Sequence, residues 1–211
     1  MKCVHARSRP TRIILLLLAA ALLSACSPPE PPQLQQATLL PSPKPIAAFN
    51  LTDQKGERFT LDDLKGHWTF AFFGYTHCPD VCPTSLGMLA QVMRSLEKTT
   101  PPEQMPQGLF VSVDPQRDTP ETLAKYVAYF YPEFIGATGD SAQIDALTHQ
   151  LGVLYIRKQG DSAGDYLFDH SAAIVLLDPD GRYHALFNVP HDPEKIASDF
   201  VQIRNYYEAT R

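Results

Sequence analysis

The chain has 211 residues, of which 44% are hydrophobic and 19% are charged. That length suits one domain, or at most two small ones. It carries 18 Lys and Arg against 23 Asp and Glu, a net charge of −5, and its sequence shows no basic patch. A nucleic-acid partner is therefore not expected, because phosphate binding requires clustered Lys and Arg.

The first 25 residues have the pattern of a secretory signal. Four basic residues precede an apolar run at 13–23, and small residues follow it. The run is shorter than the about 20 apolar residues that a membrane-spanning helix needs. We therefore expect residues 1–25 to be a signal peptide that directs the rest of the chain out of the cytoplasm.

The segment Leu23-Ser24-Ala25-Cys26 resembles the bacterial lipobox. The resemblance implies that Cys26 becomes the lipidated first residue of a lipoprotein; the alternative is an uncleaved signal anchor. Either outcome places the domain in a bacterial cell envelope, on the periplasmic side of a membrane. Ser27, in place of the aspartate that retains some lipoproteins at the inner membrane, slightly favours the outer membrane.

Loss of the signal removes four basic residues, which leaves 14 against 23 acidic ones and a net charge of −9. Such a charge favours a cationic partner or a metal ion. Residues 26–45 contain seven prolines, so we expect an extended, semi-rigid tether. The domain is then predicted to span 46–211.

Within 46–211, strands alternate with helices. We expect a hairpin of 49–53 and 58–61 with Gly56 in its turn, and a polar loop between residue 157 and about residue 166. The other predicted strands are 68–73, 108–113, 134–137, 152–157, 172–177 and 182–188. The predicted helices are 84–98, one with Thr119 or Asp118 as its N-cap and Pro120 as its first helical residue, 141–151, and one from Pro193 to about Tyr207. This order predicts an α/β sandwich with a mixed central sheet flanked by helices.

Four cysteines are present, but Cys3 leaves with the signal and Cys26 is assigned to a lipid. Cys78 and Cys82 remain, between a buried strand and a helix that we expect to start at Pro83. A disulfide over so short a loop stabilises little. If the segment from Cys78 enters the first helical turn, both sulfurs share a face, and the helix dipole lowers their pKa. The thiolate form serves both disulfide exchange and metal binding, so the pair alone leaves both uses open.

Two thiolates select Cu(I) or, less exclusively, zinc. A structural zinc site needs four ligands, and no second cysteine pair exists, whereas copper accepts a single histidine as the third ligand. The histidines left after the signal are His67, His77, His149, His170, His184 and His191. We expect five of them at the surface or in caps. His170 differs, since it directly precedes the buried strand 172–177; the alternative is a histidine hydrogen-bonded in a loop.

Three blocks resemble the Sco/SenC copper proteins. They are Phe-Phe-Gly-Tyr-Thr-His-Cys-Pro-Asp-Val-Cys-Pro at 72–83, Val-Ser-Val-Asp-Pro-Gln-Arg-Asp-Thr-Pro at 111–120, and Asp-His-Ser at 169–171. The resemblance covers about 46–207. It implies a thioredoxin-like fold, here with an N-terminal β-hairpin extension, and copper, as Cu(I) or Cu(II), bound by Cys78, Cys82 and His170.

The resemblance also implies a function. Members assist maturation of the dinuclear copper centre of cytochrome c oxidase, by delivering copper or by reducing its cysteines. We therefore expect a membrane-tethered copper chaperone whose partner is the copper-bearing oxidase subunit or another copper protein. The alternative is a thiol–disulfide oxidoreductase in which Cys78 and Cys82 form a redox-active disulfide. Whether the protein is an enzyme stays open.

A comparison with thioredoxins favours copper over general disulfide exchange. Thioredoxins carry Cys-x-x-Cys and a cis-proline before the facing strand, whereas this chain has Cys-x-x-x-Cys and Asp-His-Ser-Ala at 169–172. Asp80 and Asp169 are candidates for hydrogen bonds that tune the ligands, although both also suit plain turns. A peroxiredoxin-like peroxidase is disfavoured, because no Thr-x-x-Cys with a partner arginine is evident.

Overall fold

The computed structural model describes residues 29–159 and 165–211. Residues 33–202 form one compact unit, which contains all the described strands. The described residues 29–32 and 203–211 are assigned to a second unit. The predicted signal peptide and Cys26 lie outside the described residues. Across the part that is described, none of the helices combines the length and hydropathy needed to span a bilayer.

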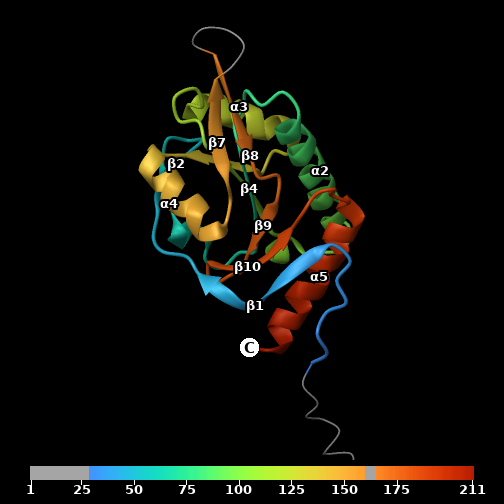
Figure 1. The fold of residues 1–211 in the computed structure, drawn as a ribbon. Coiled ribbons are helices and arrows are strands. Elements are labelled where there is room, and N and C mark those ends of the chain that lie inside the picture. Colours follow the sequence, from blue (N-terminus) through green and yellow to red (C-terminus); the bar gives the residue numbers. More distant parts are fainter. Residues whose placement is uncertain (1–28, 160–164) are drawn as a thin grey trace, which may run out of the picture. The chain divides into compact units, whose positions relative to one another are not determined.

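The core of residues 33–202 is one mixed sheet of eight strands, in the order β1-β10-β9-β4-β5-β6-β2-β3 (Figure 1). The neighbours β4, β5 and β6 pair in parallel, and the other neighbours pair antiparallel. The strands are β1 (Ala37–Pro45), β2 (Asn50–Asp53), β3 (Arg58–Thr60), β4 (Thr69–Gly74), β5 (Gln107–Ser112), β6 (Ile135–Thr138), β9 (Ile174–Leu177) and β10 (Arg182–Phe187).

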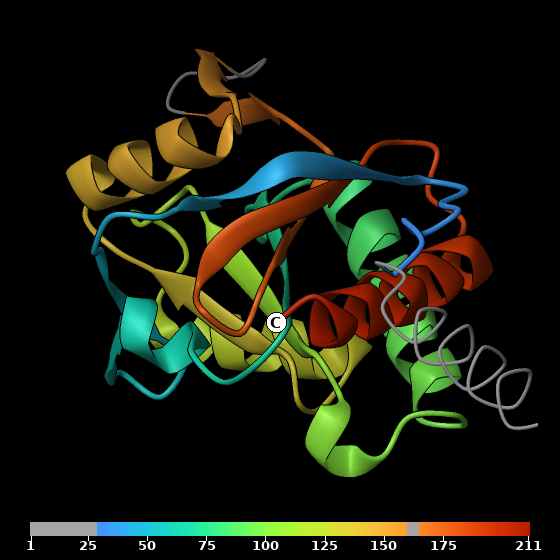
Figure 2. The ribbon, with the colours of Figure 1, turned by 90° about the horizontal axis from the view of Figure 1, so that it is seen from below.

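Helices cover both faces of this sheet. They are α2 (Val81–Leu96), α3 (Pro120–Phe130), α4 (Ser141–Leu151) and α5 (Pro193–Ala209), with short 3₁₀ turns η2 (Leu61–Leu64) and η3 (Pro102–Gln104). The helices α2, α3 and the first turns of α5 lie on one face, and α4 lies on the other (Figure 2). This mixed sheet flanked by four helices confirms the predicted fold class.

The central strand β4 shows why the sheet is buried on both sides. All six of its residues are buried, and successive side chains of a strand point to opposite faces. Phe70 packs on Phe200 of α5, with ring centroids 5.3 Å apart, whereas Phe73 joins the apolar cluster that includes residues of α4. Full burial of such a side chain contributes about 1.5–3 kcal/mol, so this strand fixes the position of the residues that follow it.

Most predicted elements are present with small shifts at their ends. The hairpin of β2 and β3 turns at Gly56, whose φ of +81° suits glycine. Thr119 caps α3 by accepting a hydrogen bond from the Thr122 backbone N–H, and Pro120 is the first helical residue, as predicted.

Two predictions were wrong. The predicted tether reached residue 45, but Ala37–Pro45 forms strand β1, which pairs with β10 at the edge of the sheet. Buried Asp199 anchors its start by accepting hydrogen bonds from the backbone of residues 35–37. The second error lies after the polar loop, which was expected to end near residue 166, because no strand was predicted between that loop and residue 172. Residues Tyr166–His170 form β8, which pairs with β7 (Tyr155–Gln159) in a separate two-stranded sheet.

Candidate metal centre

The two cysteines lie where β4 leads into α2. The strand ends at Gly74, a loop of residues 75–80 follows, and α2 begins at Val81. Cys82 is therefore the second helical residue, whereas Cys78 lies in the loop, and the predicted start at Pro83 was two residues late. The Cys82 backbone N–H faces the Cys78 Sγ atom at 3.4 Å, which keeps the two thiols at one point of the junction.

The Cys82 side chain occupies space that is available only because residue 74 is a glycine. Its side chain is fully buried, and its Sγ atom lies over Gly74 at the end of β4. A Cβ atom added at Gly74 would lie 2.5 Å from this sulfur and 3.2 Å from the ring of Phe110. Glycine at position 74 is therefore required for the thiol to approach the sheet.

His170 completes the cluster from another part of the chain. It is the last residue of β8, and its Nε2 atom lies 3.1 Å from the Cys82 Sγ atom. Its Nδ1 atom lies 3.1 Å from the carbonyl oxygen of Ser171. A carbonyl only accepts, so Nδ1 carries the proton and donates it, and the bare Nε2 faces the thiols. The potential ligand atoms of Cys78, Cys82 and His170 all lie within 4.8 Å of one another.

Burial determines the electrostatics of this cluster. Burial raises the pKa of Cys82 well above that of an ordinary thiol, and the hydrogen bond to the Tyr75 backbone offsets only part of this effect. The prediction that the helix terminus lowers this pKa was therefore wrong for Cys82. Burial likewise lowers the pKa of His170 and keeps its imidazole neutral. A bound cation would favour the thiolate, and two sulfurs with one imidazole nitrogen suit a soft ion such as Cu(I).

Two aromatic rings pack against the imidazole. His170 meets the ring of Phe72 edge to face at 5.9 Å between centroids, and the ring of Tyr75 at 6.0 Å. Tyr75 in turn packs on Phe168 of β8 at 5.3 Å. These rings cover part of the imidazole, and an apolar surrounding of this kind limits the access of solvent to a metal ligand.

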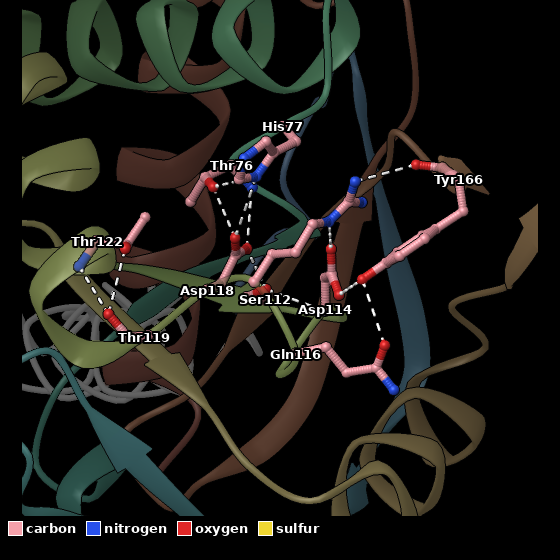
Figure 3. A network of polar contacts seen from close by, with 10 residues as sticks. Thr76, His77, Ser112, Asp114, Gln116, Asp118, Thr119, Thr122 and Tyr166 are labelled. Carbon is pink, nitrogen blue, oxygen red and sulfur yellow. Dashed lines mark hydrogen bonds and ion pairs between the residues drawn. The ribbon is translucent and has the colours of Figure 1, made fainter. Parts of the chain in front are cut away.

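A buried carboxylate holds the loop before Cys78 (Figure 3). Asp118 is fully buried and accepts hydrogen bonds from the Thr76 backbone N–H at 2.9 Å and from the Thr76 hydroxyl at 2.6 Å. The hydroxyl of Ser112, at the end of β5, donates to the same carboxylate. The block at 111–120 was recognised in the sequence only as part of a family resemblance. The structure shows that Ser112 and Asp118 of this block support the cysteine loop.

The other histidines lie elsewhere. His67, His77 and His149 are exposed, as expected, and His77 points toward Thr76 and Asp118 rather than into the cluster (Figure 3). His191 is half-buried beside the carbonyl of Phe187. The surface prediction was wrong for His184, which is buried within β10, where its Nδ1 lies 3.2 Å from the carboxylate of Asp178.

Neither candidate tuning aspartate is buried beside the thiols. Asp80 is exposed at the N-cap of α2, and its side chain makes no capping hydrogen bond. Asp169 is exposed on β8 and pairs with Lys158 of β7. Asp169 does act on His170 from a distance, because its charge raises the pKa of the imidazole and opposes part of the effect of burial.

Comparisons with known proteins agree with this geometry. The profile of the SCO1/SenC family matches residues 39–205. A SCO2-like protein of Rickettsia felis is 40% identical over 149 residues, which are 70% of this chain and 71% of that protein. Copper-bound ScoI of Bradyrhizobium japonicum is 42% identical, with a TM-score of 0.67 over 77% of this chain and 99% of that one. Copper-bound ScoI of Arabidopsis thaliana is 32% identical, with a TM-score of 0.71 over 76% and 98%.

Proposed function

The chain belongs to the SCO1/SenC family, and we propose that it carries copper as a cargo bound by Cys78, Cys82 and His170. The observation that supports this most directly is the convergence of the three potential ligand atoms within 4.8 Å. Similar structures of this family contain copper. The donor set of two sulfurs and one imidazole nitrogen selects Cu(I) over harder ions.

The ligand protonation states support binding of a cation. A neutral His170 offers its Nε2 lone pair without first losing a proton, because its Nδ1–H is donated to the Ser171 carbonyl. Cys82 must lose a proton that burial makes hard to remove. Copper binding therefore releases protons from the thiols, and the positive ion replaces them as the partner of the buried sulfurs.

We further propose that the recipient is a copper protein, with the dinuclear copper centre of cytochrome c oxidase as the first candidate, as expected from family membership. Cys82 is fully buried, whereas Cys78 retains 9% exposure and His170 is only partly buried. Ligands of a recipient therefore reach the ion from the side of Cys78 and His170. Copper passes by stepwise exchange of these ligands, and the dithiol is left behind.

A second candidate is reduction of a client disulfide. In that reaction the Cys78 thiolate attacks one sulfur of the client disulfide and releases the other as a thiol, which leaves a mixed disulfide. Cys82 then displaces the second client thiol and forms a disulfide with Cys78, so that two electrons pass to the client. Both thiols are free in the structure, which permits this reaction. The raised pKa of Cys82 disfavours it as the first nucleophile, so the attack is assigned to Cys78. The convergence of His170 on the two thiols is not needed for disulfide exchange, and it supports copper transfer better.

For the N-terminus we propose a lipid on Cys26 and a short tether that ends before β1 at Ala37. The proposal follows from the lipobox-like sequence, and it places the domain at the periplasmic side of a bacterial membrane. Growth of cells with labelled fatty acid tests it directly. Label should appear in the full chain and disappear in Cys26→Ala; label in both, or in neither, contradicts the proposal.

The copper proposal is tested by Cu(I) titration of the full chain against a chromophoric competitor. The wild type should bind one ion, and His170→Ala should bind it about tenfold or more weakly, with loss of a nitrogen neighbour in the X-ray absorption spectrum. Cys82→Ala should abolish tight binding. His149→Ala, which removes an exposed histidine on α4, is the control and should bind like the wild type.

Two results would count against copper transfer. Equal Cu(I) affinity of wild type and His170→Ala would remove His170 from the ligand set. Absence of a tight site in the wild type, together with rapid reduction of a model disulfide by the dithiol, would leave the reductase function in its place.

A further inference from the structure

His170 belongs to a two-stranded hairpin that is separate from the main sheet. It ends β8, and among the described residues β7 and β8 form no ladder with the eight-stranded sheet (Figure 1). Backbone hydrogen bonds such as that from Ser171 N–H to the Leu154 carbonyl, at 2.8 Å, close the base of this hairpin. Apart from its short chain connections, such as 171–173 to β9, side chains therefore join this hairpin to the rest of the unit.

The register identifies which side chains face inward. Tyr155 pairs with His170, Arg157 with Phe168, and Gln159 with Tyr166, and paired residues share one face of a hairpin. Tyr166 on this face is 7% exposed. The residues of the opposite face that flank it, such as Leu167, are exposed. Tyr166 is therefore the buried anchor at the far end of β8, about 13 Å from His170 at the usual rise of a strand.

Tyr166 is bound at two points to the turn that follows β5 (Figure 3). Its hydroxyl donates to the Asp114 Oδ1 atom at 2.8 Å, and its backbone carbonyl accepts from the Arg117 Nη1 atom at 3.1 Å. Asp114 is 1% exposed and also accepts from the Arg117 Nε atom. A buried carboxylate with these two donors has its charge compensated, and loss of either donor would leave part of the charge unpaired.

Arg117 joins the hairpin to the cysteine loop. Its guanidinium carbon lies 3.7 Å from the ring centroid of Tyr166 and 5.6 Å from that of Tyr75. Tyr75 directly follows the end of β4, and its ring packs against His170 and Phe168. One planar cation thus contacts the hairpin and the residue that starts the loop to Cys78, and a lysine could not reproduce this stacking and fork.

We propose that Asp114, Arg117 and Tyr166, which we name the hairpin latch, position His170 against the cysteine pair. The latch holds the far end of β8, and along the strand it keeps the imidazole Nε2 atom beside the Cys82 Sγ atom, where it would be available to a bound copper ion. Arg117 is a positioning residue, because its hydrogen bonds go to Asp114 and Tyr166 and not to the three proposed ligands. This inference rests on the proposed copper site, and it adds residues on which the third ligand depends.

The test is a cycle of Arg117→Ala and His170→Ala in the full chain, read by Cu(I) competition and X-ray absorption. Arg117→Ala should weaken Cu(I) binding about tenfold and reduce the nitrogen contribution to the spectrum. In the His170→Ala background the same substitution should change affinity less than about twofold, because the ligand that it positions is already absent. A purely structural role of Arg117 would not produce this dependence on His170.

Matched variants distinguish an effect of the latch on Cu(I) affinity from two other effects of Arg117→Ala, the loss of a nearby positive charge and a general loss of stability. Arg157 stacks on the same ring of Tyr166, also at 3.7 Å, but it is exposed. Arg157→Ala should therefore bind Cu(I) like the wild type. If Arg117→Ala does not fold, Tyr166→Phe decides, because it removes only the hydroxyl bond to Asp114 and keeps the ring and the carbonyl. It should weaken binding a few-fold with His170 present and not without it.

Several outcomes would overturn the latch. Wild-type affinity with an unchanged nitrogen contribution in folded Arg117→Ala would show that His170 needs no such support. Equal losses with and without His170 would assign Arg117 to the cysteine loop instead. A wild type that binds no Cu(I) would contradict the proposed function itself, a result that is distinguished from failure of the latch because it requires no variant.

Discussion

The two sides of the metal centre are held in different ways. Cys82 is fully buried in α2 over the end of the central strand β4, so the packing that stabilises the fold also fixes its sulfur. His170 ends a two-stranded hairpin whose outer residues Ile156 and Leu167 are 64% and 41% exposed. Its position relies on a few side-chain contacts, among them those of the latch.

This difference separates stability from metal binding. A change on the cysteine side should destabilise the fold and the site together, because one set of contacts serves both. A change on the histidine side outside the buried latch should weaken copper binding with a smaller loss of stability, since little of the core is involved. The following substitutions test the contrast, beginning with the largest expected effect.

Gly74→Ala should cause the greatest loss. The added Cβ atom would lie 2.5 Å from the Cys82 Sγ atom, so the thiol or the strand must shift, at a cost of about 3 kcal/mol in unfolding free energy. Urea unfolding measures this loss, and Cu(I) competition should show weaker binding. Gly87→Ala is the control, because a Cβ atom there meets nothing within 4 Å and should stabilise α2 by up to about 1 kcal/mol. Similar stability of the two variants would contradict the account of Gly74.

Asp118→Asn should have the next largest effect. The carboxylate accepts bonds from Thr76 and Ser112, and an amide cannot accept all of them, so we expect a loss of about 2 kcal/mol. Asp118 supports the cysteine loop, so the substitution should also weaken Cu(I) binding. This weakening should remain in the His170→Ala background. If Asp118→Asn instead had no effect on Cu(I) affinity in the His170→Ala background, as expected for Arg117→Ala, the cysteine side and the histidine side would not be supported separately.

Tyr155→Phe should have a modest effect on the histidine side. The Tyr155 hydroxyl donates to the Asp145 carboxylate of α4 at 2.5 Å, and its loss should cost about 1 kcal/mol. We expect Cu(I) affinity to fall a few-fold in the same measurement. A loss of stability as large as that of Asp118→Asn would show that the hairpin is part of the main cooperative unit.

Lys158→Ala should have the smallest effect. Lys158 pairs with Asp169 on the outer face of the hairpin, where both side chains are more than half exposed. Such pairs contribute less than about 1 kcal/mol. Thermal unfolding and Cu(I) affinity should both match the wild type. A clear loss of copper would instead give the charge of Asp169 a direct role at the site.

Much of the fold could be predicted because its local signals are strong. The apolar run of β4 and the cap and proline of α3 are each determined by a few neighbouring residues. The strand β8 was missed because its alternation spans only five residues, Tyr-Leu-Phe-Asp-His, with half-buried Phe168 and His170. The strand β1 was missed because its prolines suggest an unpaired chain, whereas an edge strand tolerates them.

The three candidate ligands of the site could be predicted, but the residues that support them could not. The sequence brought Cys78, Cys82 and His170 together through residue chemistry and family resemblance, and the structure places their ligand atoms side by side. The supporting residues Arg117 and Asp118 were visible only as part of a block. Nothing in the sequence indicated that they contact a loop about 40 residues earlier and, for Arg117, a strand about 50 residues later.

By itself, the sequence determined most of the elements and, together with the family resemblance, indicated the soft donor set, because periodicity, caps and ligand chemistry are properties of short segments. Only the tertiary structure decided the protonation state of Cys82 and the support of His170. Burial raises that thiol's pKa against the expected effect of the helix terminus, and the depth of burial depends on strands that are distant in sequence. The hairpin is held by Asp114, Arg117 and Tyr166, whose contacts exist only after the chain has folded.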